Sequence, residues 1–239
     1  MLFRSATATY TLDQAVAGLH INPDGSYSFD PSDAAYQNLA AGEPRDVVAH
    51  FTVTDDQNAV SHQTLTITVT GVNDTPVIES TSSRAGAVTE SGHTDGGADV
   101  AGTAWVTGAM VATDVDAGAT KLWSVTGSTS DAYGSFSIDS TTGVWKYDLD
   151  NTLTATQQLQ EGQSVTQTYT VRVTDNASAI DDETVTITIN GTNDRPEAYS
   201  AQYSTGENQT LISGLPTASD IDGAITSYAL VNGPSAGTV

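Results

Sequence analysis

The chain has 239 residues, and its 29 Asp and Glu against seven Lys and Arg give a formal net charge of -22. A field of this sign repels nucleic acid and anionic lipid and attracts cations, so we expect no nucleic-acid partner and no direct membrane insertion. The absence of cysteine excludes disulfides, zinc–thiolate sites and a cysteine nucleophile.

Taken in chain order, short β-branched segments alternate apolar and polar residues. A period of two places successive side chains on opposite faces of a strand, and no comparable segment keeps the helical period of 3.6. Turns rich in Gly, Asn and Asp separate the segments, with Gly25 and Gly143 at the predicted left-handed positions. This pattern predicts an all-β fold of tandem Greek-key β-sandwiches. The segments are 24–30, 51–56, 64–70, 142–148, 165–173 and 184–189.

The sequence repeats with an offset of 120 positions. TLTITVTGVNDTP at 64–76 matches TVTITINGTNDRP at 184–196, and FTVTDD at 51–56 matches VRVTDN at 171–176. The segment 24–30 also matches 142–148, at an offset that is two residues shorter. A fixed offset over this length indicates one domain present twice.

We therefore predict three domains. Residues 1–75 would hold the C-terminal part of one sandwich, because too few residues precede Thr11 to supply the strands that 88–125 supply in the next. Residues 76–195 would form a complete sandwich. Residues 196–239 would hold the N-terminal part of a third, since the segment around Glu207 echoes the segment around Glu90.

Pairs of Asp residues two positions apart recur in register. On an extended strand such residues point the same way, so Asp114 with Asp116, and Asp220 with Asp222, can chelate one ion. Calcium suits such oxygen donors better than magnesium, which demands a tight octahedron. A single Asp at a turn is ordinarily a backbone cap, and an Asn-Asp-x-Pro segment is ordinarily a turn. Recurrence of the whole set favours calcium, Ca2+, as the cofactor.

The linkers Gly-Val-Asn73-Asp74-Thr-Pro and Gly-Thr-Asn193-Asp194-Arg-Pro, with the segment Gly-Ser-Tyr-Ser-Phe-Asp at 25–30, resemble the bacterial VCBS repeat. This is a cadherin-like domain of large adhesins of the repeats-in-toxin class. The resemblance covers nearly all of residues 11–239, and residues 228–239 resemble a related bacterial Ig-like, cadherin-like repeat.

The resemblance implies calcium at each junction between successive domains. Carried over by position, the first junction would use Asn73, Asp74, Asp114, Asp116 and Asp175, with Asp30 or Asp33 as a further donor. The second junction would use Glu90, Asp150, Asn193, Asp194, Asp220 and Asp222.

The linkers depart from the cadherin pattern in four places, which implies one or two ions per junction. Gly71 and Gly191 stand where an Asp is usual, and Thr75 and Arg195 stand where an Asn is usual. We expect that Arg195 could pair with a neighbouring carboxylate instead.

We predict no enzymatic activity, because no nucleophile elbow or phosphate-binding glycine loop is present. Paired acids could serve a glycosidase, but such sites need an aromatic cleft and only 7% of residues are aromatic. Core packing is the expected role of Trp105, Trp123 and Trp145, with a sugar platform as the alternative.

The expected function is a calcium-stiffened structural segment of a large bacterial surface or secreted adhesin, active in cell adhesion or biofilm. Its partners would be neighbouring repeats of the same polypeptide, with cell-surface or matrix polysaccharide as a further candidate. The alternatives are a carbohydrate-binding module of an exopolysaccharide-associated protein and accessory domains of a secreted hydrolase. The start of the sequence shows no signal-peptide pattern, so we expect an extracellular or cell-surface location reached without a cleaved N-terminal signal.

Overall fold

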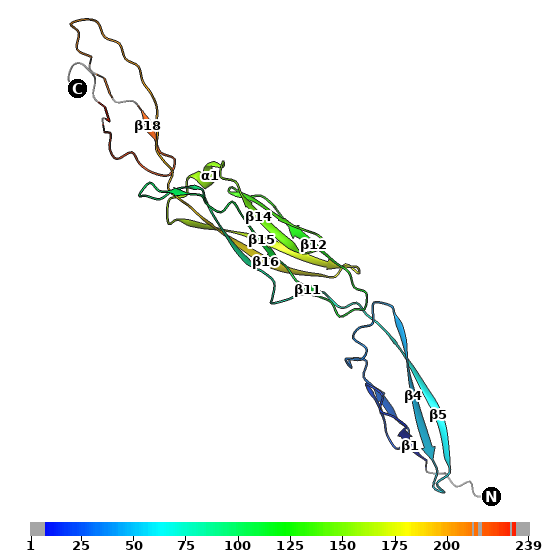
Figure 1. The fold of residues 1–239 in the computed structure, drawn as a ribbon. Helices are drawn as coiled ribbons and strands as arrows, with labels where there is room; N and C mark the ends of the chain where they lie inside the picture. The colour runs from blue at the N-terminus through cyan, green and yellow to red at the C-terminus, as the bar shows by residue number, and fades with distance from the viewer. Residues whose placement is uncertain (1–7, 212, 215–216, 230, 233–239) are drawn as a thin grey trace. The chain divides into compact units, whose positions relative to one another are not determined.

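The computed structural model describes residues 8–211, 213–214, 217–229 and 231–232, and divides into two compact units. The first unit comprises Met1–Glu79, Ala112–Leu122 and Val173–Asp181, and the second comprises the remaining residues. Figure 1 shows the described residues of both units built largely from strands, with the short helix α1 (Thr154–Gln157) in the second. The all-β prediction is confirmed, whereas the three domain boundaries stay a prediction.

The first unit is built on a long hairpin. Strand β4 (Pro44–Thr54) pairs antiparallel with β5 (Val60–Thr70) without a break, from Pro44 opposite Thr70 to Thr54 opposite Val60. Strand β1 (Thr9–Leu12) joins the other side of β4, so the order is β1-β4-β5. The remaining two-stranded sheets are β2 (Leu19–Ile21) with β3 (Tyr27–Phe29) and β6 (Val77–Ile78) with β11 (Ala112–Thr113).

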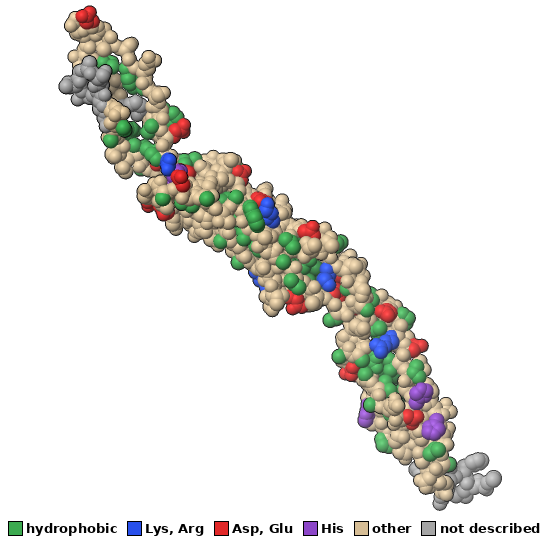
Figure 2. All heavy atoms as spheres, viewed as in Figure 1, with side chains coloured by type: hydrophobic (Ala, Val, Ile, Leu, Met, Phe, Trp, Pro, Cys, Tyr) green, Lys and Arg blue, Asp and Glu red, His purple; other side chains and the backbone are tan. Residues whose placement is uncertain are grey.

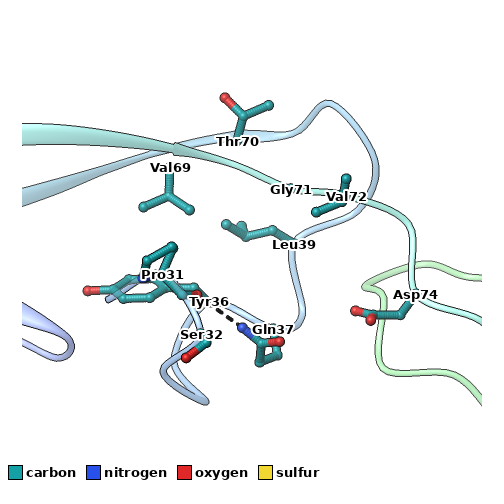
Figure 3. Close-up of a pocket in the computed structure, with 10 residues that line it drawn as sticks. All are labelled: Pro31, Ser32, Tyr36, Gln37, Leu39, Val69, Thr70, Gly71, Val72 and Asp74. Carbon is teal, nitrogen blue, oxygen red and sulfur yellow. Dashed lines mark hydrogen bonds between the residues drawn. The ribbon is translucent and has the colours of Figure 1, made fainter. Parts of the chain in front are cut away.

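A small apolar core closes one end of this unit. Tyr36, Leu39, Val47 and Val69 are buried together, and the Tyr36 hydroxyl donates to the carbonyl of Ala17 at 2.7 Å. Figure 3 shows the adjoining pocket of about 330 Å³, whose labelled apolar side chains face one another while that of Asp74 lies apart from them. The core therefore ends where the Asn73-Asp74 linker begins.

The second unit contains a two-layer sandwich. One sheet has the order β12-β15-β16-β7, in which β7 lies parallel to β16, and the other has the order β10-β14-β13. Strands β12, β15 and β16 begin or end in residues of the first unit. The strands are β7 (Ala85–Thr89), β10 (Trp105–Ala109), β12 (Lys121–Thr126), β13 (Gly134–Ile138), β14 (Val144–Leu149), β15 (Ser164–Asp175) and β16 (Ile180–Asn190).

Aromatic stacking fills the space between these sheets. The Phe136 ring stacks on Trp145 with centroids 5.7 Å apart and on Tyr169 at 4.5 Å. Trp145 is fully buried, and its Nε1 donates to the carbonyl of Ser83 at 2.8 Å. Trp123 is also buried, which agrees with core packing, but Trp105 is 54% exposed.

The remaining elements are short. Helix α1 covers Thr154–Gln157, β8 (Gly92–His93) pairs with β9 (Asp99–Val100), and β17 (Glu197–Ala198) pairs with β18 (Ala218–Ser219). None of the helices in the described ranges is long and apolar enough to cross a membrane. Figure 2 shows acidic side chains scattered over the visible face and not gathered in one block.

The predicted repeat is visible in the strand register. Strand β16 occupies the residues of β5 shifted by 120 positions, and both strands are 11 residues long. The pair β17-β18 repeats the pair β6-β11, with Ala198 opposite Ala218 where Ile78 lies opposite Ala112. Gly25 and Gly143 have φ values of 87° and 70°, which confirms the two left-handed turn positions.

Candidate metal centres

The first predicted set of ligands is held together by hydrogen bonds within the first unit. We call it the first acidic cluster. The Asn73 amide donates to Asp175 Oδ2 at 2.7 Å, and the backbone N–H of Asp74 donates to Asp116 Oδ2 at 2.8 Å. The N–H of Asp116 in turn donates to Asp114 Oδ1 at 3.0 Å. All five residues predicted for this junction are therefore brought together: Asn73, Asp74, Asp114, Asp116 and Asp175.

Two carboxylate oxygens of this cluster are buried without a partner. Asp114 Oδ2 and Asp116 Oδ1 accept no hydrogen bond, although both atoms are shielded from solvent. A buried charged oxygen that lacks a donor is costly. A cation is the partner whose charge and coordination demands match such oxygens.

The second predicted set repeats this geometry within the second unit. The Asn193 amide donates to the carbonyl of Asp194 at 2.8 Å, as Asn73 does to Asp74 at 2.6 Å. The N–H of Asp194 donates to Asp222 Oδ2 at 3.2 Å, in the position of the Asp74–Asp116 bond. Asp194 Oδ2 and Asp222 Oδ1 are again buried without a partner. The second acidic cluster is defined as Glu90, Asn193, Asp194, Asp220 and Asp222.

Glu90 is the most deeply placed acid of the second acidic cluster. Its side chain has no solvent exposure, accepts from the Gln157 amide at 2.9 Å through Oε1, and accepts from the N–H of Thr192 at 3.3 Å through Oε2. Burial raises the pKa of Glu90 to about 7, the Thr192 N–H opposes this, and the charges of Asp194 and Asp222 add to it. The negative charges of Asp194 and Asp222 therefore repel a charged Glu90 side chain.

Burial also raises the pKa values of two neighbouring acids. Burial, followed by a hydrogen bond with Asp220, raises the pKa of Asp222. Burial raises the pKa of Asp194 as well, with His93 opposing and Asp220 adding to the shift. In the first acidic cluster, by contrast, the Asn73 hydrogen bond lowers the pKa of Asp175. In the second acidic cluster the charged forms of Glu90, Asp194 and Asp222 are thus disfavoured without a cation.

Three further predicted donors serve their own turns. Asp150 Oδ1 accepts from the N–H and the hydroxyl of Thr152, at 2.8 and 2.6 Å. Asp30 Oδ1 accepts from the N–H and the hydroxyl of Ser32, and Asp33 Oδ1 accepts from the N–H of Ala35. These are the backbone caps that single Asp residues ordinarily form, and a role of Asp150 in the second junction stays a prediction.

Two contacts at the second acidic cluster, both made by Gln side chains, had no signal in the sequence. Gln157 on α1 reaches Glu90, and the Gln160 amide donates to the carbonyl of Asp222 at 2.6 Å. His93 lies beside Asp99, with Nε2 3.2 Å from Oδ1, and Arg195 joins the same carboxylate at 3.1 Å. The expectation that Arg195 pairs with a neighbouring carboxylate is confirmed.

The two clusters fit a hard divalent cation by their donor chemistry. Carboxylate and amide oxygens are the ligands that calcium takes, and four of these oxygens lack any partner. In the part of the chain that the structure describes, no group of three or more His, Cys, Asp or Glu side chains is already arranged to hold a metal ion.

Comparison with known proteins bears on this arrangement. The chain resembles the crystal structure of human CDH23 EC21-23 with a TM-score of 0.53 and 18% identity, over 92% of this chain and 75% of that one. Drosophila N-cadherin EC1-4 has a TM-score of 0.45 and 14% identity, over 92% of this chain and 52% of that one. PcdhgB3 EC1-4 has a TM-score of 0.47 and 17% identity, over 91% of this chain and 51% of that one.

The chain spans about half the length of the latter two structures. No curated protein matches it. The likeness to CDH23 shows the cadherin fold. Residues 73–191 match the bacterial cadherin-like domain family, and they contain the first acidic cluster together with Glu90 of the second. This part of the chain is a bacterial cadherin-like domain.

Proposed function

We propose that the chain is a calcium-stiffened structural repeat segment of a large bacterial surface or secreted adhesin. Cadherin-like domains are typically extracellular, generally bind calcium, and form an adhesive or structural fold without enzymatic activity. The observation that carries the proposal is the recurrence of two buried, unpartnered carboxylate oxygens in each of two clusters.

The chain's own residues supply a physical reason for stiffening. Each linker, at Asn73-Asp74 and at Asn193-Asp194, is hydrogen bonded to an Asp-x-Asp pair. The carboxylates gathered there repel one another, and this repulsion favours separation of each linker from its Asp-x-Asp pair. Residues of both clusters would hold calcium, which supplies the positive charge that offsets this repulsion.

The expected affinity matches an extracellular setting. Extracellular calcium modules bind with dissociation constants of about 10⁻⁴ to 10⁻³ M. Sites of this strength are empty at cytosolic calcium and filled outside the cell. At a hundredfold excess over that constant, each site adds roughly 2.7 kcal/mol to the folded state.

Thermal unfolding tests the proposal. We expect the unfolding midpoint to rise in millimolar calcium relative to chelator, and magnesium at the same concentration to give a smaller rise. The double variant Asp116→Asn with Asp222→Asn should lose most of this rise, because each substitution removes a buried unpartnered oxygen. Asp139→Asn is the matched control, since Asp139 caps an exposed turn through Thr141 and Thr142. An equal midpoint with and without calcium would end the proposal.

Stiffening has its own readout. Small-angle scattering of the full chain should give a larger maximum dimension in calcium than in chelator, because filled clusters restrict the linkers. The double variant should give the chelator value under both conditions. A midpoint that rises with unchanged dimensions would support calcium binding and remove the stiffening role.

Carbohydrate binding is a second candidate, favoured by one side chain. Trp105 is 54% exposed, lies opposite Asp148 across β10 and β14, and has Lys146 Nζ 5.6 Å from its ring centroid. An exposed indole beside charged groups can stack on a sugar ring. Retention of the full chain on a glycan array, lost in Trp105→Ala, would support this function.

A further inference from the structure

The small hairpin β8-β9 lies against the linker that carries Asn193 and Asp194. The His93 N–H donates to the carbonyl of Asn193 at 2.7 Å, and the Asn193 N–H donates to the carbonyl of His93 at 2.9 Å. Two residues that exchange both main-chain bonds form the hydrogen-bonded pair of an antiparallel ladder. The hairpin and residues 191–195 all belong to the second unit. The linker is therefore paired to its own unit through its backbone.

Gly92 permits this close approach. A Cβ at position 92 would overlap the Thr192 hydroxyl and would lie 2.8 Å from the carbonyl oxygen of Asn193. Thr192 is buried, so its side chain has little room to move aside. Glycine is the residue that lets a second backbone segment come this near. Gly92 therefore sets how closely the linker lies against the hairpin.

Two other segments of the second unit brace the hairpin. At its base the Ser91 N–H donates to Asn151 Oδ1 at 2.9 Å, and Asn151 Nδ2 donates to the carbonyl of Ser91 at 3.2 Å. At its tip the Asp95 N–H donates to Glu161 Oε2. The hairpin is thus anchored at both ends.

Arg195 adds a weaker contact between the linker and the hairpin. Its Nη2 donates to Asp99 Oδ1 at 3.1 Å and to the carbonyl of Gly97 at 3.4 Å. The side chains of Arg195 and Asp99 are 62% and 83% exposed, and exposed ion pairs contribute little. The backbone pair and the Asn151 bonds therefore hold the linker more firmly than this ion pair does.

The stronger contacts do not depend on the charge of the second acidic cluster. The pair of His93 with Asn193 uses main-chain groups, and Asn151 is uncharged, so repulsion among carboxylates does not act on them. The bond that joins the linker to the Asp-x-Asp pair is different, because the Asp194 N–H donates to the carboxylate of Asp222 at 3.2 Å. Without a cation, the linker should stay on the hairpin while its bond to Asp222 opens.

We propose that the hairpin β8-β9 is a metal-independent clasp that fixes residues 191–195 and thereby positions Asn193 and Asp194 to bind a divalent cation. Gly92 and Asn151 are its positioning residues. Fixing a ligand before binding lowers the cost of ordering it on binding, and loss of the groups that orient metal ligands typically weakens metal binding by about 10- to 100-fold. The positioning role rests on the proposed calcium function, whereas the clasp itself does not.

Amide hydrogen exchange of the full chain, followed by NMR in chelator and in calcium, tests the clasp. The N–H groups of His93 and Asn193 should exchange at least about tenfold more slowly than in an unstructured chain under both conditions, because their bonds need no metal. The Asp194 N–H should be protected in calcium and lose its protection in chelator. Rapid exchange of His93 and Asn193 in chelator would overturn the clasp.

Calcium titration of the same amide signals tests the positioning role. The Asp194 signal reports the second acidic cluster, and the Asp74 signal reports the first, since each N–H donates to an Asp-x-Asp carboxylate. Gly92→Ala should weaken calcium binding at the second acidic cluster by about tenfold or more. Binding at the first should not change, although a general loss of stability would not produce such a difference between the two sites.

Two further variants complete the test. Gly96→Ala is the matched control in the same hairpin, because a Cβ there would meet only Thr94 Oγ1, at 3.6 Å. Asn151→Ala should weaken calcium binding at the second acidic cluster by less than Gly92→Ala, because it leaves the linker pair intact. It carries the same test should Gly92→Ala fail to fold, which circular dichroism determines.

The outcomes separate this proposal from the proposed function. Unchanged calcium affinity in folded Gly92→Ala and Asn151→Ala would overturn the positioning role while the calcium function stands. A wild-type chain with protected His93 and Asn193 amides and no response to calcium would support the clasp, and would overturn the calcium function together with the positioning role.

Discussion

The hairpins β4-β5 and β15-β16 carry the same alternating pattern but differ in burial. In β16 the inward residues Val185, Ile187 and Ile189 have no exposure. In β5 the corresponding Leu65 and Ile67 are half-buried, and Val69 is 9% exposed. Alternation of apolar and polar residues is therefore not sufficient to bury one face of a strand.

Partner strands account for the difference. In the second unit β7 covers the edge of β16, and β10 joins β14 in the facing sheet. Among the described residues of the first unit, no strand takes either place. Apolar burial is a property of the assembled layers, because each layer shields only the surface that another layer touches.

The largest expected effect comes from matched aromatic truncations in the two copies. Trp145→Ala should lower the free energy of unfolding by about 3–5 kcal/mol, the range for a fully buried aromatic residue. Tyr27→Ala should change it by only about 0.5 kcal/mol, as exposed positions usually do. Urea unfolding followed by circular dichroism measures both. Equal effects would mean that the first unit is packed as tightly as the second.

The second prediction concerns the two acidic clusters, where the effect of a substitution on the unfolding midpoint should depend on calcium. At pH 7 without calcium, Asp222→Asn should raise the unfolding midpoint, because burial and Asp220 disfavour the charged form of Asp222. In saturating calcium it should lower the midpoint, since loss of a site removes roughly 2.7 kcal/mol at a hundredfold excess. Asp116→Asn should likewise lower the midpoint in saturating calcium, because it removes a buried unpartnered oxygen of the first acidic cluster. A decrease for Asp222→Asn under both conditions would contradict this explanation.

The sequence was sufficient to predict features that depend on local pattern. Alternation of Thr with apolar residues predicted β5 and β16, and the linker and Asp-x-Asp motifs predicted groups that the structure joins by hydrogen bonds. Each of these motifs lies in a short segment whose backbone geometry fixes where its side chains point.

Features that depend on distant segments could not be predicted. The contact of Gln157 with Glu90 joins residues 67 positions apart, and no spacing rule connects them. Asp150 was assigned from resemblance alone, yet its Oδ1 caps Thr152. The exposure of Tyr27 follows from which strands accompany it, and its own sequence matches that of the buried Trp145 segment.

The third prediction concerns pH and separates the second acidic cluster from the first. Burial raises the pKa of Glu90 from its ordinary 4.5 to about 7. Between these values the folded chain holds a proton that the unfolded chain has released, so stability without metal falls as pH rises from about 4.5 to 7. Asp194 and Asp222 contribute in the same direction.

Glu90→Gln should therefore reduce this loss, as measured by chemical unfolding at pH 5 and pH 7.5 in chelator. Calcium requires deprotonated carboxylates, so in saturating calcium the wild-type chain should lose the trend. An unchanged pH trend in Glu90→Gln would show that other groups carry it.

The smallest expected effect comes from the outer faces of the two hairpins. Arg172 pairs with Asp182 through two bonds of 2.7 Å, whereas Thr52 at the position of Arg172 bonds His62 at 2.9 Å and Asp13 at 2.6 Å. Thr52→Arg with His62→Asp would place the ion pair on β4-β5. Exposed pairs contribute little and are screened by salt.

We expect this double variant to raise the unfolding midpoint at low ionic strength by less than any change above, and to lose the gain in about 1 M salt, where the Debye length is about 3 Å. The single variant Thr52→Arg should change the midpoint little, because the guanidinium takes the place of the Thr52 hydroxyl beside Asp13. The single variant His62→Asp should lower the midpoint, because Asp at position 62 would face Asp13 without a compensating charge. A gain that persists in high salt would mean that packing, and not charge, distinguishes the two outer faces.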